Sequence, residues 1–288
     1  MAPCASASSP GHLSGYFRPV YGPTPAETGS VGAGIVIREG VTATVWPAKK
    51  TGVTVERRHP RDGRVVEVIE SSPPVEHLLS RIGVEARVKT ACSLPIGAGF
   101  GLSAAALLAT AVAADALFGL SLSPREQAEL AHEAELAFHT GLGDVAACTG
   151  GGRDCRRGAG VAAPIERSFD VVEPLCALVF GPLPSPQVLQ SGDAMQRVTA
   201  AFPEGCPGDV CEFFQLSRSF AEKSGLITPG IRRALGICDS AGVAATMTML
   251  GNGIFAYGDD APDILAPLGE VFLLHPADSG ARLLEAKQ

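Results

Sequence analysis

Charged residues are scarce in this 288-residue sequence, and long charged or apolar runs are absent. Asp, Glu, Lys and Arg make up 18% of the chain, and the formal net charge is −7. The one basic cluster, Arg153, Arg156 and Arg157, is short and has no aromatic residue within it, which argues against nucleic acid as a partner. The longest mainly apolar run, Ala104–Ala114, is too short to span a bilayer. The N-terminus shows no secretory signal, so we expect a cytoplasmic protein with no membrane partner.

The cysteines lack the two-residue spacing that zinc knuckles and redox motifs require. We expect most of them to be reduced thiols that pack as small apolar side chains. Two closely spaced pairs, Cys148 with Cys155 and Cys206 with Cys211, could alternatively each close a small disulfide loop. The full set is Cys4, Cys92, Cys148, Cys155, Cys176, Cys206, Cys211 and Cys238.

The first half of the sequence reads as strands followed by two helices. Residues Val31–Pro47 predict a β-hairpin with its turn at Glu39 and Gly40, because β-branched residues occupy both arms. Strands are predicted in "GVTVERR", "GRVVEVIE" and "VEARVKTACSLP", with a short helix in "PPVEHLLSRIG" before the last of these. A buried helix is predicted over Leu102–Phe118. Ser123 then has the pattern of an N-cap that opens a second helix, through Phe138.

The second half mixes strands with helices. Strands are predicted in "GVAAPIER", "LCALVFGPL", "VAATMTML" and "EVFLLHP", and helices near 186–202, 210–223 and 229–241. The stretch "GLGDVAACTGGGRD" is predicted to be a glycine-rich turn region. This order of elements favours an α+β protein over strict βαβ alternation, and the length favours two lobes without a linker.

The stretch "ACSLPIGAGFGLSAAALL" carries glycine at 97, 99 and 101 directly before the predicted helix. It is not a Walker loop, because no lysine precedes Ser103. Gly-x-Gly-x-x-Ala would fit a dinucleotide fingerprint, but a second helix follows where a strand should stand, which disfavours an NAD-dependent oxidoreductase. The glycines could also serve only a tight turn. An anion would satisfy the free N–H groups and the positive dipole end of the helix, so a phosphate loop is the favoured interpretation.

This loop resembles the phosphate-binding motif of the GHMP kinases, Pro-x-x-x-Gly-Leu-Gly-Ser-Ser-Ala. The frame is kept, with Phe100 in place of the first Leu and Leu102 in place of the first Ser. Three further stretches fall in the family's order: "SSPGHLSGYF", "AHEAELAFHTGLGDVAACTGGG" and "MTMLGNGIFAYG". The variants "GAGFGLSAA", "TGLGDV" and "GSVGAG" are similar to those of the archaeal pantoate kinase branch.

The resemblance implies a GHMP kinase fold, with a ribosomal-protein-S5-like N-terminal lobe over 1–165 and a ferredoxin-like C-terminal lobe over 166–288. It also implies an ATP- and Mg²⁺-dependent transfer of phosphate to the 4-hydroxyl of pantoate, on the archaeal route to coenzyme A. Related acceptors, such as mevalonate, homoserine or shikimate, and a nucleotide-binding regulator without catalysis stay open as alternatives. The sequence leaves the oligomeric state open, a homodimer included.

The family's roles fall on matching positions of this chain. Ser103 and a helical carboxylate, Glu135 in preference to Glu133, would hold Mg²⁺. Asp144 would accept the proton of the attacking hydroxyl or orient it. Each of these acids could instead have an ordinary surface or turn role. The ATP-binding loop would comprise Pro95, Gly97, Ala98, Gly99, Phe100, Gly101, Leu102, Ser103 and Ala104. The candidate substrate ligands are His12, Ser14, Gly32, Arg153 and Asn252.

Overall fold

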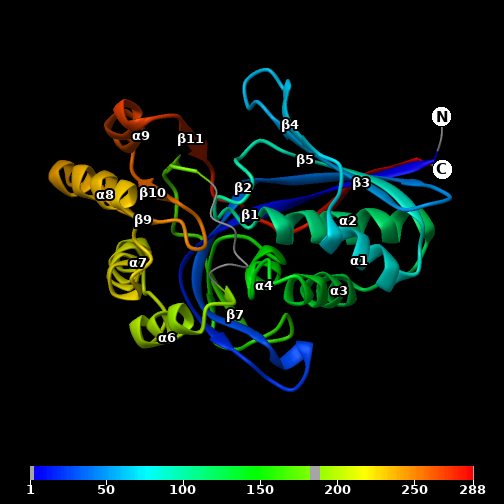
Figure 1. Ribbon diagram of the computed structural model, residues 1–288, viewed down its shortest axis with the longest axis horizontal. Coiled ribbons are helices and arrows are strands. Elements are labelled where there is room, and N and C mark those ends of the chain that lie inside the picture. Colours follow the sequence, from blue (N-terminus) through cyan, green and yellow to red (C-terminus); the bar gives the residue numbers. More distant parts are fainter. Residues whose placement is uncertain (1–2, 182–188, 288) are drawn as a thin grey trace.

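The computed structural model describes residues 3–181 and 189–287, which form two β-sheets with helices packed on them (Figure 1). The larger sheet has eight strands in the order β12-β1-β2-β5-β3-β4, with β6 paired to β2 and β7 paired to β6. The smaller sheet has the order β11-β8-β10-β9. The strands are β1 Cys4–Val20, β2 Gly29–Pro47, β3 Gly52–Arg58, β4 Val65–Ile69, β5 Ala86–Cys92, β6 Arg153–Arg156, β7 Ile165–Ser168, β8 Leu175–Val179, β9 Ala244–Met247, β10 Gly253–Tyr257, β11 Val271–Leu274 and β12 Arg282–Lys287.

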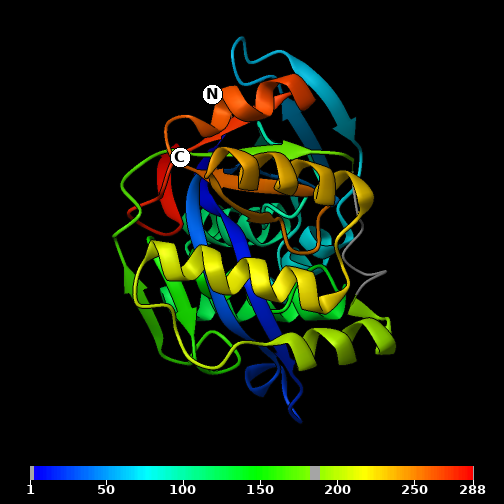
Figure 2. The same cartoon turned by 90° about the vertical axis from the view of Figure 1, so that its left-hand side faces the viewer.

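Helices pack against both sheets, and β1 of the larger sheet contacts helices from both halves of the chain. Those of the first half pack beneath the larger sheet in Figure 1, and α6, α7 and α8 lie on the other side of the molecule, where Figure 2 shows them in front of the long strands. The helices are α1 Pro73–Ile82, α2 Leu102–Phe118, α3 Pro124–Ala137, α4 Asp144–Cys148, α6 Gly192–Ala201, α7 Val210–Ser224, α8 Pro229–Ala241 and α9 Ala261–Leu265, with 3-10 turns at Pro25–Glu27 and Ala266–Leu268. None of the helices in the described part of the chain is long and apolar enough to cross a membrane.

The longest element pair is the antiparallel β1–β2 ribbon, which passes through both halves of the molecule (Figure 1). Register shifts at Ser9/Gly11 and Ser14/Tyr16 bend this ribbon. The predicted hairpin over Val31–Pro47 is therefore wrong, because these residues belong to one strand. Gly40 is required by close contact with the bulge in β1, since a β-carbon there would lie 2.0 Å from the Ser9 carbonyl oxygen.

Helix α2 is the centre of the first core. Its alanines let it lie close to the larger sheet on one side and to α3 on the other, with Leu107 and Ala111 fully buried. The predicted cap of α3 is confirmed: the Ser123 hydroxyl accepts from the Glu126 backbone N–H, and the Glu126 carboxylate accepts from the Ser123 backbone N–H. A second core joins Tyr16 and Phe17 of β1 to α7 and to the smaller sheet.

The predictions of an α+β protein with two lobes and of α1, α2, α3, α7, α8, β3, β4, β5, β8, β9 and β11 are confirmed within a few residues. The strand predicted in "GVAAPIER" is observed only from Ile165, as β7. The predicted helix near 186–202 is observed from Gly192, and residues 186–188 lie outside the described part. The predicted turn region contains the short helix α4, and β1, β6, β10 and β12 were not predicted. The division at residue 165 stays a prediction. Strands of the larger sheet lie on both sides of that position, because it includes β12.

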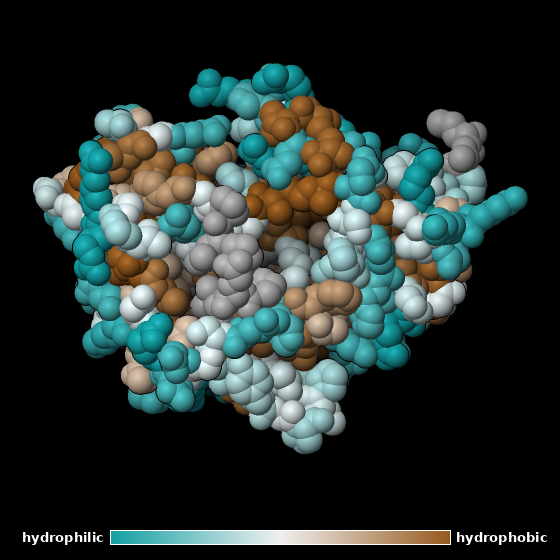
Figure 3. All heavy atoms as spheres, in the orientation of Figure 1, coloured by the Kyte–Doolittle hydropathy of each residue, from teal (hydrophilic) through white to brown (hydrophobic). Residues whose placement is uncertain are grey.

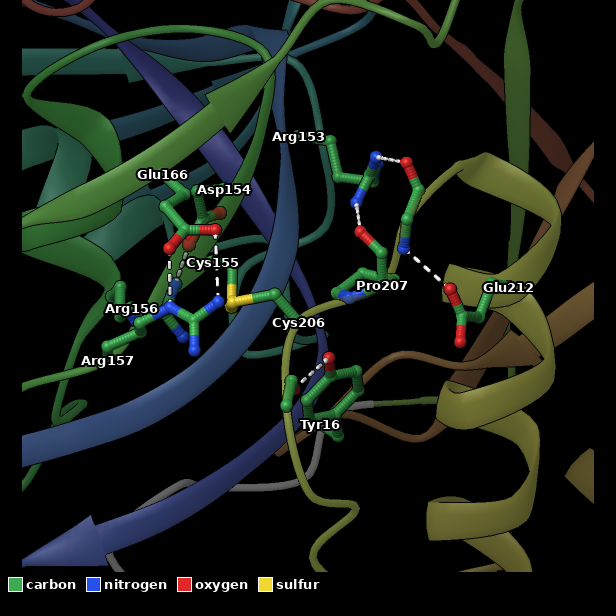
Figure 4. Close-up of a disulfide and its surroundings, with 12 residues drawn as sticks. Tyr16, Arg153, Asp154, Cys155, Arg156, Arg157, Glu166, Cys206, Pro207 and Glu212 are labelled. Atoms are coloured by element: carbon green, nitrogen blue, oxygen red, sulfur yellow. Dashed lines mark hydrogen bonds and ion pairs between the residues drawn. A yellow bond between two sulfur atoms is a disulfide. The ribbon is translucent and has the colours of Figure 1, made fainter.

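One disulfide bond, Cys155–Cys206, joins β6 to the loop before α7 (Figure 4). The expectation of reduced cysteines is therefore wrong for these two residues, and both short-range pairings are wrong as well. The six other cysteines are free thiols. Strand pairing brings Cys155 against a loop 51 residues away, which sequence spacing cannot show.

Reduction of this bond is expected to destabilise the protein. A crosslink that closes a loop of 51 residues restricts the unfolded chain, so Cys206→Ser should lower the free energy of unfolding by up to about 4 kcal/mol. Denaturant unfolding measures this loss. Cys211→Ser, which removes an exposed free thiol, is the control. Equal unfolding midpoints for the two variants, or eight titratable thiols in the native protein, would contradict the assignment.

Candidate active site

A cavity of about 370 Å³ opens between the β3–β4 hairpin, the glycine loop and the start of α4. Apolar side chains gather around this hollow beneath the hairpin in the space-filling view (Figure 3). Val41, Val55, Ile69 and Ile96 line its apolar end. Ser14, Ser30, Thr140, Gly143 and Asp144 line its polar part. Its volume and mixed lining are those of a small-molecule site.

The glycine loop runs from β5 to α2 and turns its backbone toward this cavity. Gly97, Gly99 and Gly101 all have positive φ angles, of 73°, 85° and 63°. A β-carbon at Gly99 would lie 2.8 Å from the Met249 carbonyl oxygen, so only glycine fits there. No side chain caps the N-terminus of α2, where Gly101 is the N-cap. The first N–H groups of a 17-residue helix are thus free to bind phosphate oxygens, and the loop fits ATP.

All members of the predicted loop from Gly97 to Ala104 except Ala98 line the cavity. Ala98 is buried beside Gly251, and Pro95 precedes the cavity-lining part of the loop. Leu102, which replaces the hydroxyl residue of the family pattern, lines the cavity and also packs against two of the hydrophobic clusters. Leu102 therefore contributes apolar packing where the family pattern has a hydroxyl group.

Asp144 is the first residue of α4 and lines the cavity. Its Oδ1 is 2.7 Å from the His12 Nδ1 and 3.5 Å from the Ser14 hydroxyl, which donates to it. The predicted residues His12, Ser14 and Asp144 are thus brought together, from β1 and from a helix 130 residues further along the chain.

His12 is completely buried and has a second carboxylate on its other side. Its Nε2 lies 2.7 Å from Asp154 Oδ1, and the second oxygen of Asp154 accepts from Arg156. Burial lowers the pKa of His12, but Asp154 and Asp144 outweigh it and raise the pKa above its ordinary value. For Asp154, burial acts to raise the pKa, while Arg156 and His12 prevail and hold it well below its ordinary value.

Glu135 points toward Asp144 from the inner face of α3. A β-carbon at Gly141 would lie 2.3 Å from Glu135 Oε1 and 3.0 Å from Asp144 Oδ2, so the two carboxylates meet across this glycine. Burial raises the pKa of Glu135, and its hydrogen bond with His132, 3.2 Å long, acts in the opposite direction. A divalent cation would favour the ionised carboxylate here, so these residues fit Mg²⁺. Glu133 instead pairs with Arg81 at the surface.

Of the predicted substrate ligands, Ser14 lines the cavity, and His12, Gly32, Arg153 and Asn252 do not. Arg153 donates to Asp170 and to the carbonyl oxygens of Pro207 and Gly208, and Figure 4 shows it pointing toward that loop. Gly32 is packed against the Tyr16 carbonyl, where a β-carbon would approach to 2.2 Å. Asn252 accepts a hydrogen bond from Thr228.

Strand alternation explains why Arg153 faces away. Along β6, Arg153 and Cys155 point to one side, while Asp154 and Arg156 point to the other, toward His12. Arg156 lies behind Gly143 and Ser30, and its buried Nε has no hydrogen-bond partner in the described part of the chain.

The sequence interpretation missed Asp154, Arg156, His132, Ser30 and Thr140 as parts of this region. The short basic cluster was the available signal for Arg156. It could not be used without knowing that β6 exists and which side of it faces the site.

Comparisons with known proteins agree with this geometry. The pattern of the family described as "GHMP kinases N terminal domain" matches residues 65–152. The chain is 44% identical to a pantoate kinase of Methanospirillum hungatei. The match covers 97% of this chain and 96% of that protein. The chain belongs to the GHMP kinase family. It is therefore a phosphotransferase enzyme.

Two further similarities extend over most of this GHMP kinase. A pantoate kinase of Thermococcus kodakarensis is 29% identical over 86% of the chain and 85% of that protein. A solved structure described as a phosphotransferase related to the coenzyme A biosynthesis pathway has a TM-score of 0.78 at 23% identity, with 98% of both chains covered. That structural likeness shows the GHMP kinase fold.

The two glycines at the ends of α2 allow a direct test of the close packing at the loop. Gly101 and Gly119 share a φ of 63°, but a β-carbon at Gly119 meets no atom within 4 Å, whereas one at Gly101 would lie 3.0 Å from His12 Cβ. Gly119→Ala should cost about 1 kcal/mol of unfolding free energy from backbone strain alone. Gly101→Ala should cost roughly 2–3 kcal/mol, because steric overlap is added. Equal costs in denaturant unfolding would refute the close approach.

Proposed function

We propose that this kinase transfers the γ-phosphate of ATP to the 4-hydroxyl of pantoate, which gives 4-phosphopantoate and ADP. The supporting observation is a cavity that places a glycine loop and an uncapped helix end at one side and Asp144 at the other. The 44% identical relative, which is named a pantoate kinase, supports pantoate as the acceptor. We further propose a cytoplasmic enzyme of coenzyme A biosynthesis, and a homodimer stays a prediction.

The nucleotide would lie along the glycine loop. The apolar end of the cavity, with Val41, Val55 and Ile69, suits the flat faces of a purine base. The free N–H groups of the loop and of α2 would then hold the phosphates near Ser103. Each of these backbone donors is fixed in place and stabilises the negative charge of the phosphates. Positioning and charge stabilisation are the main contributions of a protein to phosphoryl transfer.

Ser103 and Glu135 would hold Mg²⁺, because they supply a hydroxyl and a buried carboxylate near the predicted phosphate position. When bound, the ion neutralises charge on the β- and γ-phosphates. Glu135 is kept in place by His132, whose other ring nitrogen lies 2.9 Å from the Thr28 carbonyl oxygen. This arrangement fixes the carboxylate beside Gly141, with Asp144 on the other side of that glycine.

Asp144 would act on the attacking hydroxyl. Its Oδ1 is already bonded to His12, so Oδ2, which lies beside Gly141, is the oxygen that would receive the acceptor hydroxyl. A hydroxyl held by Oδ2 is oriented for attack on the γ-phosphorus, and Oδ2 takes its proton as the new O–P bond forms.

The carboxylate of pantoate would be recognised by Arg156 and Ser30. The unpartnered Arg156 Nε and the Ser30 hydroxyl both lie close to Gly143, and Ser30 and Gly143 line the polar part of the cavity. Because a buried guanidinium N–H without a partner is costly, a ligand oxygen at this point is expected. Arg156 thus replaces Arg153 as the candidate cation.

The reaction is tested by mixing the purified protein with Mg-ATP and pantoate and measuring ADP release, followed by mass spectrometry of the product. We expect phosphopantoate. The matched controls are mevalonate, homoserine and shikimate under the same conditions. Turnover with one of these and none with pantoate would keep the kinase and replace the acceptor. No turnover with any acceptor, together with ATP-dependent thermal stabilisation, would favour a nucleotide-binding regulator.

The metal assignment is tested by two glutamates of the same helix. Glu135→Gln removes the buried charge, so the Mg²⁺ concentration for half-maximal rate should rise at least about tenfold. Glu133→Gln changes only a surface pair with Arg81 and should leave this value unchanged. Titration of the rate with Mg²⁺ measures both. The opposite pattern would transfer the metal ligand to Glu133.

Substrate recognition is tested by two neighbouring arginines. Arg156→Lys keeps the charge but loses the planar set of donors, so the KM for pantoate should rise roughly 10–100-fold with little change in the KM for ATP. Arg157→Lys, at an exposed pair with Glu166, should behave like the wild type. An Arg156→Lys enzyme with an unchanged KM for pantoate would remove Arg156 from the binding site.

A further inference from the structure

His12 is held between two carboxylates by both nitrogens of its ring. Nδ1 lies 2.7 Å from Asp144 and Nε2 lies 2.7 Å from Asp154, and the side chain has no exposed surface. An ionised carboxylate can only accept, so each ring nitrogen must donate. A ring that donates from both nitrogens is the imidazolium cation. A ligand oxygen therefore finds no free position on this ring.

The charge on this ring is balanced by its neighbours. Asp154 is fully buried and also accepts from Arg156, which keeps it ionised. The groups that face the ring are Asp144 from α4, Asp154 from β6 and the Ser14 hydroxyl from β1. Arg156 does not face the ring itself but pairs with Asp154. The four charges alternate in sign from Asp144 to Arg156, so no buried charge is left without an opposite partner.

The backbone of His12 is bonded to the phosphate loop. Its N–H donates to the Phe100 carbonyl oxygen over 2.9 Å, and Gly101 packs against its backbone. The ring lies over Gly34 of β2, where a β-carbon would come within 2.0 Å of Nε2. One residue is thus fixed to the loop by its main chain and to Asp144 by its side chain.

We propose that His12 is a positioning residue, not a substrate ligand: together with Asp154 it sets the place and orientation of Asp144 relative to the phosphate loop. This rests on the proposed function, since it assumes that Asp144 acts on the acceptor hydroxyl. Because His12 holds Oδ1, the carboxylate cannot rotate freely, and Oδ2 stays beside Gly141, free to hold the acceptor hydroxyl of the proposed reaction. A misdirected carboxylate would slow the transfer step without loosening either substrate.

Two substitutions separate the two halves of the His12 contact. The side-chain nitrogen of asparagine can replace Nδ1, so His12→Asn keeps a donor to Asp144 and loses the one to Asp154. The longer His12→Gln can replace Nε2, and it keeps the donor to Asp154 while losing Asp144. We expect kcat to fall about 3–10-fold in His12→Asn and about 100-fold or more in His12→Gln. The KM values for ATP and for pantoate should change less than about threefold in both.

An increase in the KM for pantoate with kcat retained would overturn the proposal, because it would make His12 a substrate ligand. Equal loss of kcat in the two variants would overturn it as well. Wild-type enzyme without kinase activity would instead contradict the proposed function, and a second measurement that needs no turnover then decides the inference.

That measurement is the side-chain nitrogen NMR spectrum of protein labelled with ¹⁵N-histidine. At about pH 8, above the ordinary pKa of histidine, His12 should still carry a proton on both nitrogens. Its signals are those that persist in His132→Asn and disappear in either folded His12 variant. A neutral ring with one proton would refute the double donation even if neither His12 variant folds.

Discussion

The pairing of β1 with β2 is the interaction on which the rest of this structure depends. The ribbon crosses from one half of the molecule to the other, and its bulges at Ser9/Gly11 and Ser14/Tyr16 bend it at the level of the active site. One end supplies the surface for α2 and the glycine loop, and the other packs through Tyr16 and Phe17 against α7. His12 lies between these two ends. It also lies between the two bulges and is held there by contacts with β2, β6, α4 and the glycine loop.

Burial of charge is the second constraint, and the structure meets it by pairing. His12, Asp154, Arg156, Arg153 and Glu135 are all almost fully removed from solvent, which would be very costly for isolated ions. Every one of them contacts an oppositely charged or hydrogen-bonding group. Within this network, the Arg156 Nε has no hydrogen-bond partner in the described part of the chain. The N–H groups at the start of α2 are likewise not capped by a side chain. Both groups lie next to residues that line the cavity.

The sequence predicts local features of this fold well and long-range ones poorly. Helices α2 and α3 were predicted to within a residue, because an alanine-rich segment and a Ser-Pro-x-Glu cap are local signals. The glycine loop, Asp144 and Glu135 were found through local motifs as well. The hairpin predicted over Val31–Pro47 is wrong because Gly40 serves a close contact with β1 and does not form a turn. Arg153 was favoured because it follows three glycines. Arg156 could not be found, because the phase of a four-residue strand cannot be read from its residues, and the partner of Cys155 depends on the same strand.

The pairing of β12 with β1 has a consequence for how the chain folds. Cys4 is opposite Lys287, so the edge of the larger sheet is completed by residues from the two far ends of the sequence. During synthesis, the first half of β1 emerges long before its partner on that side exists, and its outer row of N–H and C=O groups stays open for the whole of that time. Contacts of such large sequence separation are slow to form, and the last of these pairs, Cys4 with Lys287, closes only after residue 287 has left the ribosome. This part of β1 is thus made long before β12, the strand that covers its outer edge.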